Sequence, residues 1–508
     1  MSLSLVSDAR YAVRWLVRSP GFSLVAVASL AVGIGFNTAI FSVVDALLLR
    51  PLPVERPDQL VDVYTRGRDG DTYSTSSYPD YLDFRDRNQV FSGMLAYSPS
   101  IAALKGTGQS RIVLGEVVTG NYFQVLGVKP VVGRTLNPED DRTGAARVAV
   151  LSYPLWAREY ASDPAVVGKT LHIHGQPYTI VGVADRAFNG MVPMLQPEIW
   201  TTIAWVADLE PAGIQDTTPS PTGTTRLDRR GQRWLFIKGR LKDGETFARA
   251  KSNLEVIMGQ LASAYPKTND RRPVALAAHV RLHPAADAML RPIAVALMVG
   301  IGLVLLVACA NVANMLLARG TARQKEIGIR LSIGASRARL IRQLLTESVI
   351  LSLVGAAAGV ALGGLLLRIL KAVPIPMPIP ISLALRIDAR VLLFTAALAT
   401  IAGVVAGLVP ALRSTRPNLA ADMKGDIVAT TAAGRRWTLR DGLVALQAAV
   451  TLVLLVTGGL LTRSILEAQR INLGFKSDGL VAVGTELGLI GYDEARATQF
   501  FDRALERV

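Results

Sequence analysis

Few residues in this sequence have the types and spacing that catalysis or metal binding requires. His172 and His174 alternate across Ile173, so in a strand they would share one face. A metal site needs a third ligand, and no carboxylate or further histidine lies near them in sequence. We therefore expect a solvated strand face. Cys309 is the single cysteine and lies in an apolar tract, which excludes an intrachain disulfide and a thiolate metal cluster.

Common catalytic and nucleotide-binding motifs are absent from the sequence. It contains no GxxxxGK[ST] phosphate-binding loop, and no GxSxG, HExxH or CxxC. Carboxylates are plentiful in one polar block, but nothing marks a catalytic pair. We expect no enzyme activity and no catalytic, cofactor-binding or metal-binding residues.

The composition divides the 508 residues between apolar tracts and one large polar block. The net charge of +15 is concentrated beside the apolar tracts, which favours a membrane surface over nucleic acid. Roughly 20 helical residues cross a hydrocarbon core of about 30 Å. The expected membrane helices are residues 22–50, 290–318, 344–370, 391–412 and 443–461. Residues 1–21 predict an interfacial amphipathic helix that carries Arg10, Arg14 and Arg18, with Trp15 at headgroup level.

The polar block, residues 51–289, predicts an α+β domain with its own core, in one lobe or two. Strand patterns begin at residues 60, 147, 178 and 233, and a helical pattern covers Glu245 to Ala264. The Pro-, Thr- and Gly-rich stretch from Leu209 to Gly231 predicts a loop or lobe boundary. We expect its four tryptophans to pack in the core: Trp156, Trp200, Trp205 and Trp234.

The connectors between the apolar tracts predict the orientation. The N-terminal segment and the connectors 319–343 and 413–442 are strongly basic, whereas the connector 371–390 is a Pro-rich turn with little net charge. By the positive-inside rule the three basic segments lie in the cytoplasm. The N-terminus is then cytoplasmic, and residues 51–289 lie outside.

The connector 319–343 also carries apolar side chains. Its seven basic residues would suffice to fix topology, but Ile327, Ile329, Leu331 and Ile333 are expected to be exposed as well. A Gly-Ala-Ser break at 334–336 precedes a second amphipathic helix. Four exposed aliphatic side chains indicate a protein partner or a membrane surface.

Small and polar residues in the membrane tracts predict helix packing. Gly355, Gly359 and Gly363 repeat every four residues, which allows close approach of another helix. Asn311 and Asn314 are polar enough to face protein, and we expect them to form hydrogen bonds across helices rather than bind a solute.

KEIGIRLSIGASRARLIRQLLTES (325–348) resembles the cytoplasmic segment of MacB/FtsX-type ABC transporter permeases, and SYPDYLDFRD and VLSYPLWAREYASDPAVVGKTLHIHGQPYTIVGVA resemble their periplasmic domain. The overall pattern is most similar to the acidobacterial duplicated orphan permeases. The resemblance implies an α-helical transmembrane bundle (4+1 helices) with a large α+β MacB-like periplasmic domain, in the bacterial inner membrane.

The resemblance also implies a function. Such a permease passes ATP-driven motion from a separate cytoplasmic MacB-type ATPase to its periplasmic domain (mechanotransmission) in export, and ATP is bound by the partner subunit. The implied ATPase-coupling residues are Lys325, Glu326, Ile327, Arg330, Gly334, Ala335, Ser336 and Arg337. Further implied partners are a second permease half or a homodimer, and a periplasmic adaptor.

Two alternatives remain open at this point. One is an FtsX-like regulator without transport activity, which recruits or activates a periplasmic cell-wall enzyme. The other is a membrane-anchored sensor or binding protein without energy coupling. In either case the sequence names no substrate.

A short repeat suggests a tandem architecture. RPDQLVDV (56–63) follows the first expected helix, and KSDGLVAV (476–483) follows the fifth. Residues 462–508 therefore predict the start of a second periplasmic domain. Since the duplicated permeases have two complete units, we expect this chain to be a fragment or a truncated product.

Overall fold

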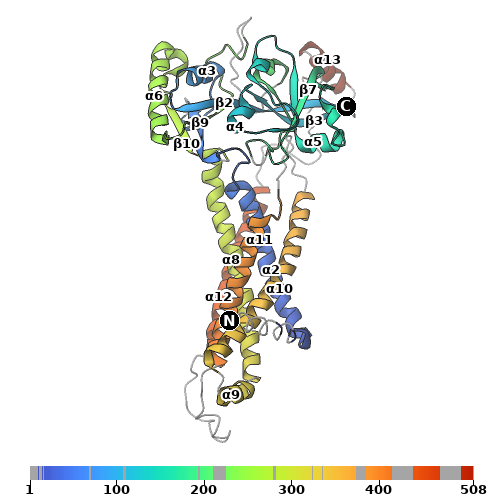
Figure 1. The fold of residues 1–508 in the computed structure, drawn as a ribbon, viewed down its shortest axis with the longest axis vertical. Coiled ribbons are helices and arrows are strands. Elements are labelled where there is room, and N and C mark those ends of the chain that lie inside the picture. Colours follow the sequence, from blue (N-terminus) through green and yellow to red (C-terminus); the bar gives the residue numbers. More distant parts are fainter. Residues whose placement is uncertain are drawn as a thin grey trace. The chain divides into compact units, whose positions relative to one another are not determined.

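The computed structural model describes residues 10, 14, 16–67, 70–106, 110–192, 195–209, 225–278, 282–322, 324–333, 336–372, 385–414, 439–469 and 494–506. Their contacts divide the chain into two compact units (Figure 1). The first unit, called the helical unit, comprises Met1–Asp45, Arg291–Pro374 and Leu385–Leu480. The second, called the sheet domain, comprises Ala46–Leu290, Ile375–Ala384 and Val481–Val508.

Five helices among the described residues are long and apolar enough to cross a membrane, over Pro20–Leu49, Pro284–Arg319, Arg337–Ala372, Ala389–Leu412 and Asp441–Ala468. They belong to α2 (Pro20–Val44, extended by a π-helical turn η1, Asp45–Leu49), α8 (Pro284–Ala322), α10 (Arg337–Ala372), α11 (Ala389–Ser414) and α12 (Leu439–Gln469). The short helix α9 (Gln324–Ser332) follows α8. α2, α10 and α11 lie side by side (Figure 1), and their shared core includes Leu30, Ile34, Leu351, Ala399 and Ala402.

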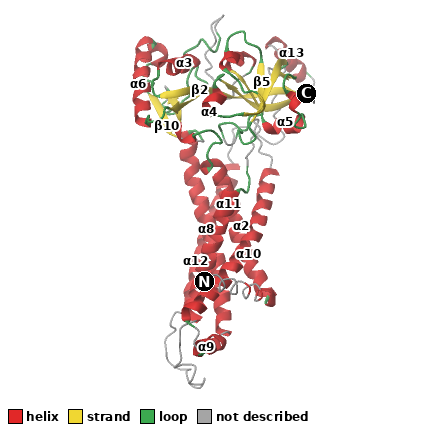
Figure 2. Ribbon diagram, in the orientation of Figure 1, coloured by secondary structure: helices red, strands yellow, loops and turns green. Residues whose placement is uncertain are grey.

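The sheet domain is built on one ten-stranded sheet of order β10-β1-β9-β2-β3-β8-β5-β7-β4, with β6 pairing β2 and β7 (Figure 2). The strands are β1 (Leu60–Thr65), β2 (Phe91–Lys105), β3 (Arg111–Val118), β4 (Pro130–Gly133), β5 (Val148–Leu151), β6 (Thr170–Ile173), β7 (Gln176–Ala184), β8 (Ile199–Thr202), β9 (Phe236–Leu241) and β10 (Val274–Ala278). The pairs β3–β8 and β5–β7 are parallel, and the other pairs are antiparallel.

Both faces of this sheet are covered by apolar side chains. Because successive side chains of a strand point to opposite faces, Val61 and Val63 of β1 enter one core cluster and Leu60 enters the other. The first cluster includes buried side chains of α3 (Tyr78–Arg87), α5 (Tyr153–Glu159) and α6 (Phe247–Ala264). The second includes those of α4 (Tyr122–Leu126). The result is a sheet between two layers, as expected for a domain with its own core.

Local sequence explains where two of these helices begin. Ser77 and Ser152 each stand before a Tyr-Pro pair. Their hydroxyls accept hydrogen bonds from the N–H groups of Asp80 (3.2 Å) and Leu155 (3.3 Å) at the starts of α3 and α5. Serine is a favoured N-cap, and proline in the first turn costs no helical hydrogen bond.

The remaining short elements are η2 (Pro57–Gln59), η3 (Pro138–Asp141), η4 (Pro164–Val166), η5 (Ile203–Asp208), α7 (Pro266–Asn269) and α13 (Glu494–Leu505).

Several predictions for the polar block can be compared with this domain. The strand patterns at 60, 147, 178 and 233 correspond to β1, β5, β7 and β9, and the pattern ending at Ala264 corresponds to α6, so these predictions are confirmed. Trp156 and Trp234 are buried in the first cluster and Trp200 in the second, and Trp205 packs half-buried against the first.

The prediction for the histidine pair is wrong. His172 lies in β6, but His174 follows the strand in a tight turn with φ of 50°, and Gly175 has φ of 79°. The β6–β7 hairpin requires positive φ in its two-residue loop, so the two imidazoles do not share a strand face. Within the described residues, no group of three or more His, Cys, Asp or Glu is placed to hold a metal ion.

Some predicted features lie outside the described residues. These are Trp15, residues 210–224 of the Pro-rich stretch, 373–384 and 415–438 of the two later connectors, and 470–493, which contain the second copy of the repeat.

Candidate coupling site in the helical unit

The connector between α8 and α10 presents fewer exposed aliphatic side chains than the sequence predicts. Ile329 and Ile333 are 59% and 80% exposed, but Ile327 is only 7% exposed and Leu331 is half-buried. The expectation of four exposed side chains is therefore wrong for Ile327, which faces inward. The helical conformation of α9 explains why Ile327 is buried and Ile329 is exposed, because side chains two residues apart point in different directions around a helix.

Ser336 has a structural role at the start of α10. Its carbonyl oxygen accepts hydrogen bonds from the N–H groups of Arg339 (3.0 Å) and Leu340 (3.3 Å), and its hydroxyl lies 3.4 Å from the N–H of Arg339. This serine thus occupies the N-cap of α10. Ser336 and Arg337 are exposed, and Arg330 is half-exposed.

The other implied coupling residues are described less fully. Lys325 and Glu326 lie in α9, but their side chains are outside the described part of the structure, as are Gly334 and Ala335 entirely.

Three glycines bring α10 against the backbone of α2. A Cβ atom added to Gly355 would lie 2.7 Å from Cβ of Leu30, and one added to Gly359 would lie 3.1 Å from the backbone nitrogen of Gly35. At Gly363 it would lie 3.2 Å from the carbonyl oxygen of Gly35. Side chains larger than hydrogen would push these two helices apart, so the glycine repeat marks the face of α10 that packs on α2.

A second close contact joins a different face of α10 to α11. A Cβ atom added to Gly403 would lie 2.8 Å from Cα of Val349, and one added to Gly407 would overlap the side chain of Ser348. Here the small residues belong to α11, and buried Ser348 and Ser352 of α10 fill the space. Consequently α10 lies between α2 and α11, held closely on both sides.

Polar side chains also join α2 to α8 and to α11. The Asn37 amide of α2 donates to the carbonyl oxygen of Ile301 in α8 (3.0 Å), and the hydroxyls of Thr38 and Thr395 lie 3.0 Å apart.

The predicted asparagines of α8 differ from each other. The Gln447 amide of α12 donates to Oδ1 of Asn311 (2.9 Å), as expected for a bond across helices. Oδ1 of Asn314 is buried and has no hydrogen-bond partner among the described residues. Cys309 of the same helix is buried.

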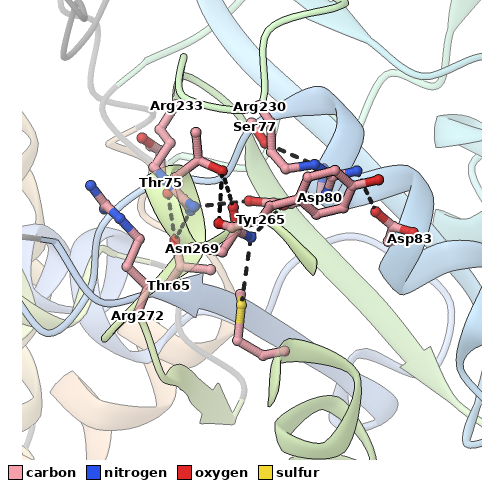
Figure 3. Close-up of polar contacts among 12 residues, drawn as sticks. Thr65, Thr75, Ser77, Asp80, Asp83, Arg230, Arg233, Tyr265, Asn269 and Arg272 are labelled. Atoms are coloured by element: carbon pink, nitrogen blue, oxygen red, sulfur yellow. Dashed lines mark hydrogen bonds and ion pairs between the residues drawn. The ribbon is translucent and has the colours of Figure 1, made fainter. Parts of the chain in front are cut away.

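The sheet domain contains an ionic cluster that sequence reasoning missed (Figure 3). Asp80 of α3 is fully buried, and its carboxylate meets Nη1 of Arg230 (2.7 Å), Nη2 of Arg233 (2.9 Å) and the amide of Asn269 (2.8 Å). Asp83, one turn further along α3, forms an ion pair with Nη2 of Arg230 at 2.7 Å. The cluster joins α3 and α7 to the chain before β9.

The sequence did contain a weak signal for this cluster. Asp80 and Asp83 are three residues apart on one helix face, and the basic run RRGQR (229–233) matches them in charge. The two segments are 150 residues apart, however, so their pairing could not be predicted from spacing.

Five long apolar helices and a large sheet domain define a multi-pass membrane protein with a substantial extramembrane part. Two family models match this chain. Residues 23–257 match the MacB-like periplasmic core domain, and residues 298–419 match the FtsX-like permease C-terminal model. The chain belongs to the MacB/FtsX-type permeases, which are permease components of ABC transporters.

Similar curated proteins include a probable export ATP-binding/permease protein of Pseudomonas fluorescens, which is 27% identical over 246 residues, or 48% of this chain and 34% of that protein. Another is the macrolide export ATP-binding/permease protein MacB of Escherichia coli K12, 25% identical over 307 residues, or 59% of this chain and 43% of that protein. The matched segments thus span less than half of these relatives.

Among solved structures, the periplasmic region of MacB from Actinobacillus actinomycetemcomitans aligns with 46% of this chain and 92% of its own length, at 15% identity and a TM-score of 0.32.

Proposed function

We propose that this chain is a permease subunit that transmits ATP-driven motion from a separate cytoplasmic ATPase to its sheet domain on the periplasmic side, in an export process. ATP is bound by that partner, which docks on α9 and the start of α10. The N-terminus lies in the cytoplasm. The family relationship supports this proposal, since its curated members combine ATP-binding and permease parts.

One observation carries the docking assignment. Ile329 and Ile333 expose 59% and 80% of their surfaces in a connector between two candidate membrane helices. Exposed aliphatic side chains with arginines close by in sequence fit the usual anatomy of a protein interface, in which an apolar centre is surrounded by a polar rim and arginine is enriched. Here Arg330 and Arg337 supply the rim, and Ser336 fixes the start of the helix behind it.

Substitution of the apolar centre tests the docking site. Ile333→Asp places a charge where an apolar side chain would be buried, and loss of one such contact is worth about 1.5–3 kcal/mol. We expect association with a co-expressed MacB-type ATPase to weaken by at least about tenfold. Val256→Asp on α6 is the matched control, because Val256 is 61% exposed in the sheet domain. Equal binding by both variants would refute docking at α9.

Orientation is tested separately with engineered cysteines. Ser336→Cys and Asp243→Cys place thiols at exposed sites in the helical unit and the sheet domain. In intact cells, a reagent that cannot cross the inner membrane should label the second and not the first. The native Cys309 is buried, so the labelling of the protein without engineered cysteines gives the background signal. Labelling of Ser336→Cys alone would reverse the proposed topology.

A further inference from the structure

The carboxyl group of Glu116 is enclosed in the centre of the sheet domain. Glu116 lies on β3 opposite Pro99 of β2 and Trp200 of β8, and it is 2% exposed. Aromatic rings surround it on this face of the sheet. Those in mutual contact are Tyr122, Phe123, Phe188 and Trp200, with ring centroids 5.2–6.2 Å apart.

Only one of the two carboxyl oxygens is well supplied with donors. Oε2 accepts hydrogen bonds from the hydroxyl of Tyr122 (2.9 Å) and the indole nitrogen of Trp200 (2.8 Å). Oε1 has no hydrogen-bond partner among the described residues and faces the backbone at Gly190, where an added Cβ would lie 3.5 Å away. The backbone N–H of Met191 lies near the carboxyl group of Glu116 and favours its charged form, but it does not reach hydrogen-bond geometry with Oε1. An ionised carboxylate with one oxygen unsatisfied is costly, so this geometry suits the protonated acid.

The cation whose charge lowers the pKa of Glu116 is already paired. Lys238 of β9 is buried and forms an ion pair with Asp62, its cross-strand neighbour on β1. Tyr97 of β2 faces both carboxylates, and burial together with their charges raises the pKa of its phenol.

The segment that carries Met191 contributes no charge to the carboxyl group. Arg186 lies over the ring of Tyr153, 5.3 Å from its centroid. The Asp185 carboxylate accepts from the N–H of Ala187 at 2.8 Å. Glu198, which follows on the chain, pairs with Arg111 and Arg158.

These surroundings place the titration of Glu116 near neutrality. Burial raises its pKa from 4.5 to about 7, and the hydrogen bonds of Tyr122 and Trp200, the Met191 backbone and the charge of Lys238 offset only part of that effect.

We propose that Glu116 is a proton-binding switch of the sheet domain. In acidic medium the carboxyl group is neutral, and the domain stays closed over it. As the carboxyl group ionises, the domain opens to water at α4 and around Met191. The open site solvates Oε1, and the closed site does not. The switch acts through packing within the domain and does not depend on the docking proposed for α9.

Hydrogen–deuterium exchange of the full chain in lipid nanodiscs tests the switch. In the open state the pKa of the Glu116 carboxyl returns to its ordinary value near 4.5. After correction for intrinsic rates, exchange in residues 119–128 and 186–192 should therefore rise about tenfold per pH unit between pH 4.5 and 7, then level off. Glu116→Gln has the same shape and cannot ionise, so its corrected exchange should stay constant. A Glu116→Gln profile with the wild-type slope would overturn the proposal.

A second variant covers the case in which Glu116→Gln does not fold. Tyr122→Phe removes one donor to the charged form, so the pH at which exchange levels off should move upward. Asp141, whose pKa burial raises to about 6, titrates in the same range, but its carboxylate accepts from the N–H groups of Gly120 and Ala204, whereas the Tyr122 hydroxyl donates to Glu116. An unchanged midpoint in Tyr122→Phe assigns the transition to another group and refutes the role of Glu116.

Discussion

Replacing Asp80 with alanine should destabilise the sheet domain strongly. The side chain is fully buried and neutralises Arg230 and Arg233, of which Arg233 is only 7% exposed. Removing one partner of a buried ion pair costs about 3–5 kcal/mol, because the other charge stays in the interior. Arg230 keeps Asp83 and Arg233 keeps the hydroxyl of Thr65, so we expect the lower end, about 3 kcal/mol.

Thermal unfolding of the full chain in detergent measures this loss. Four of its six tryptophans lie in the sheet domain, so their fluorescence reports mainly on that domain. For a domain of this size, each kcal/mol lowers Tm by about 2–4 °C, which gives a decrease of about 6–12 °C for Asp80→Ala.

An exposed ion pair supplies the matched control for Asp80. Asp243 pairs with Arg56 at 3.0 Å, but the two side chains are 79% and 59% exposed. Such pairs contribute about 0–1 kcal/mol, so Asp243→Ala should lower Tm by at most about 2–4 °C. Adding Arg233→Met to Asp80→Ala should recover part of the loss, because it removes the uncompensated cation. Equal effects of Asp80→Ala and Asp243→Ala would refute the account of the cluster.

Three further predictions follow from the packing and the charges. Gly359→Leu should separate α10 from Gly35 of α2 and reduce folded yield in detergent, whereas Gly458→Leu, with open space around it, should not. Gln447→Leu should remove the bond to Asn311 and lower the efficiency of a disulfide engineered between α8 and α12, at a cost of about 0.6 kcal/mol. Glu116→Gln should flatten the pH dependence of the free energy of unfolding. In the wild type the raised pKa of Glu116 stabilises the fold fully below pH 4.5, and about 3 kcal/mol of this stabilisation is lost as the pH rises to 7. Chemical unfolding at several pH values measures the difference.

Patterns local in the sequence predicted the elements well. Alternation and β-branched residues were enough for β1, β5, β7 and β9, because each strand has at least one buried face. The histidine prediction failed on a local feature that was also present: Gly175 after His174 is a hairpin turn signal, and it outweighs the alternation of the two imidazoles.

Pairings between distant segments could not be predicted in the same way. The repeat at Gly355, Gly359 and Gly363 identifies a packing face, but not that Gly35 of α2 lies opposite it. Glu116 reads in the sequence as an ordinary strand glutamate. Its burial depends in part on Trp200, which comes from a strand reached much later and pairs beside it in parallel register. Such contacts depend on the topology, which a single sequence does not contain.

The two glycine contacts of α10 limit how the proposed coupling can work. α10 begins at Arg337, within the proposed docking segment, and is packed through close contact against α2 on one face and α11 on another. Rotation of α10 alone would drive Leu30 and Ser348 into these contacts, since neither interface has room for a displaced side chain. A force applied at α9 is therefore expected to move α2, α10 and α11 together as one block. α2 also contacts α8 closely, because the Asn37 amide donates to the carbonyl oxygen of Ile301 and a Cβ atom added to Gly33 would lie 3.1 Å from the side chain of Leu305. α12 meets α8 through the Asn311–Gln447 bond, and most of its described side chains are exposed. The boundary at which such a block, with α8, would slide is therefore the one between α8 and α12.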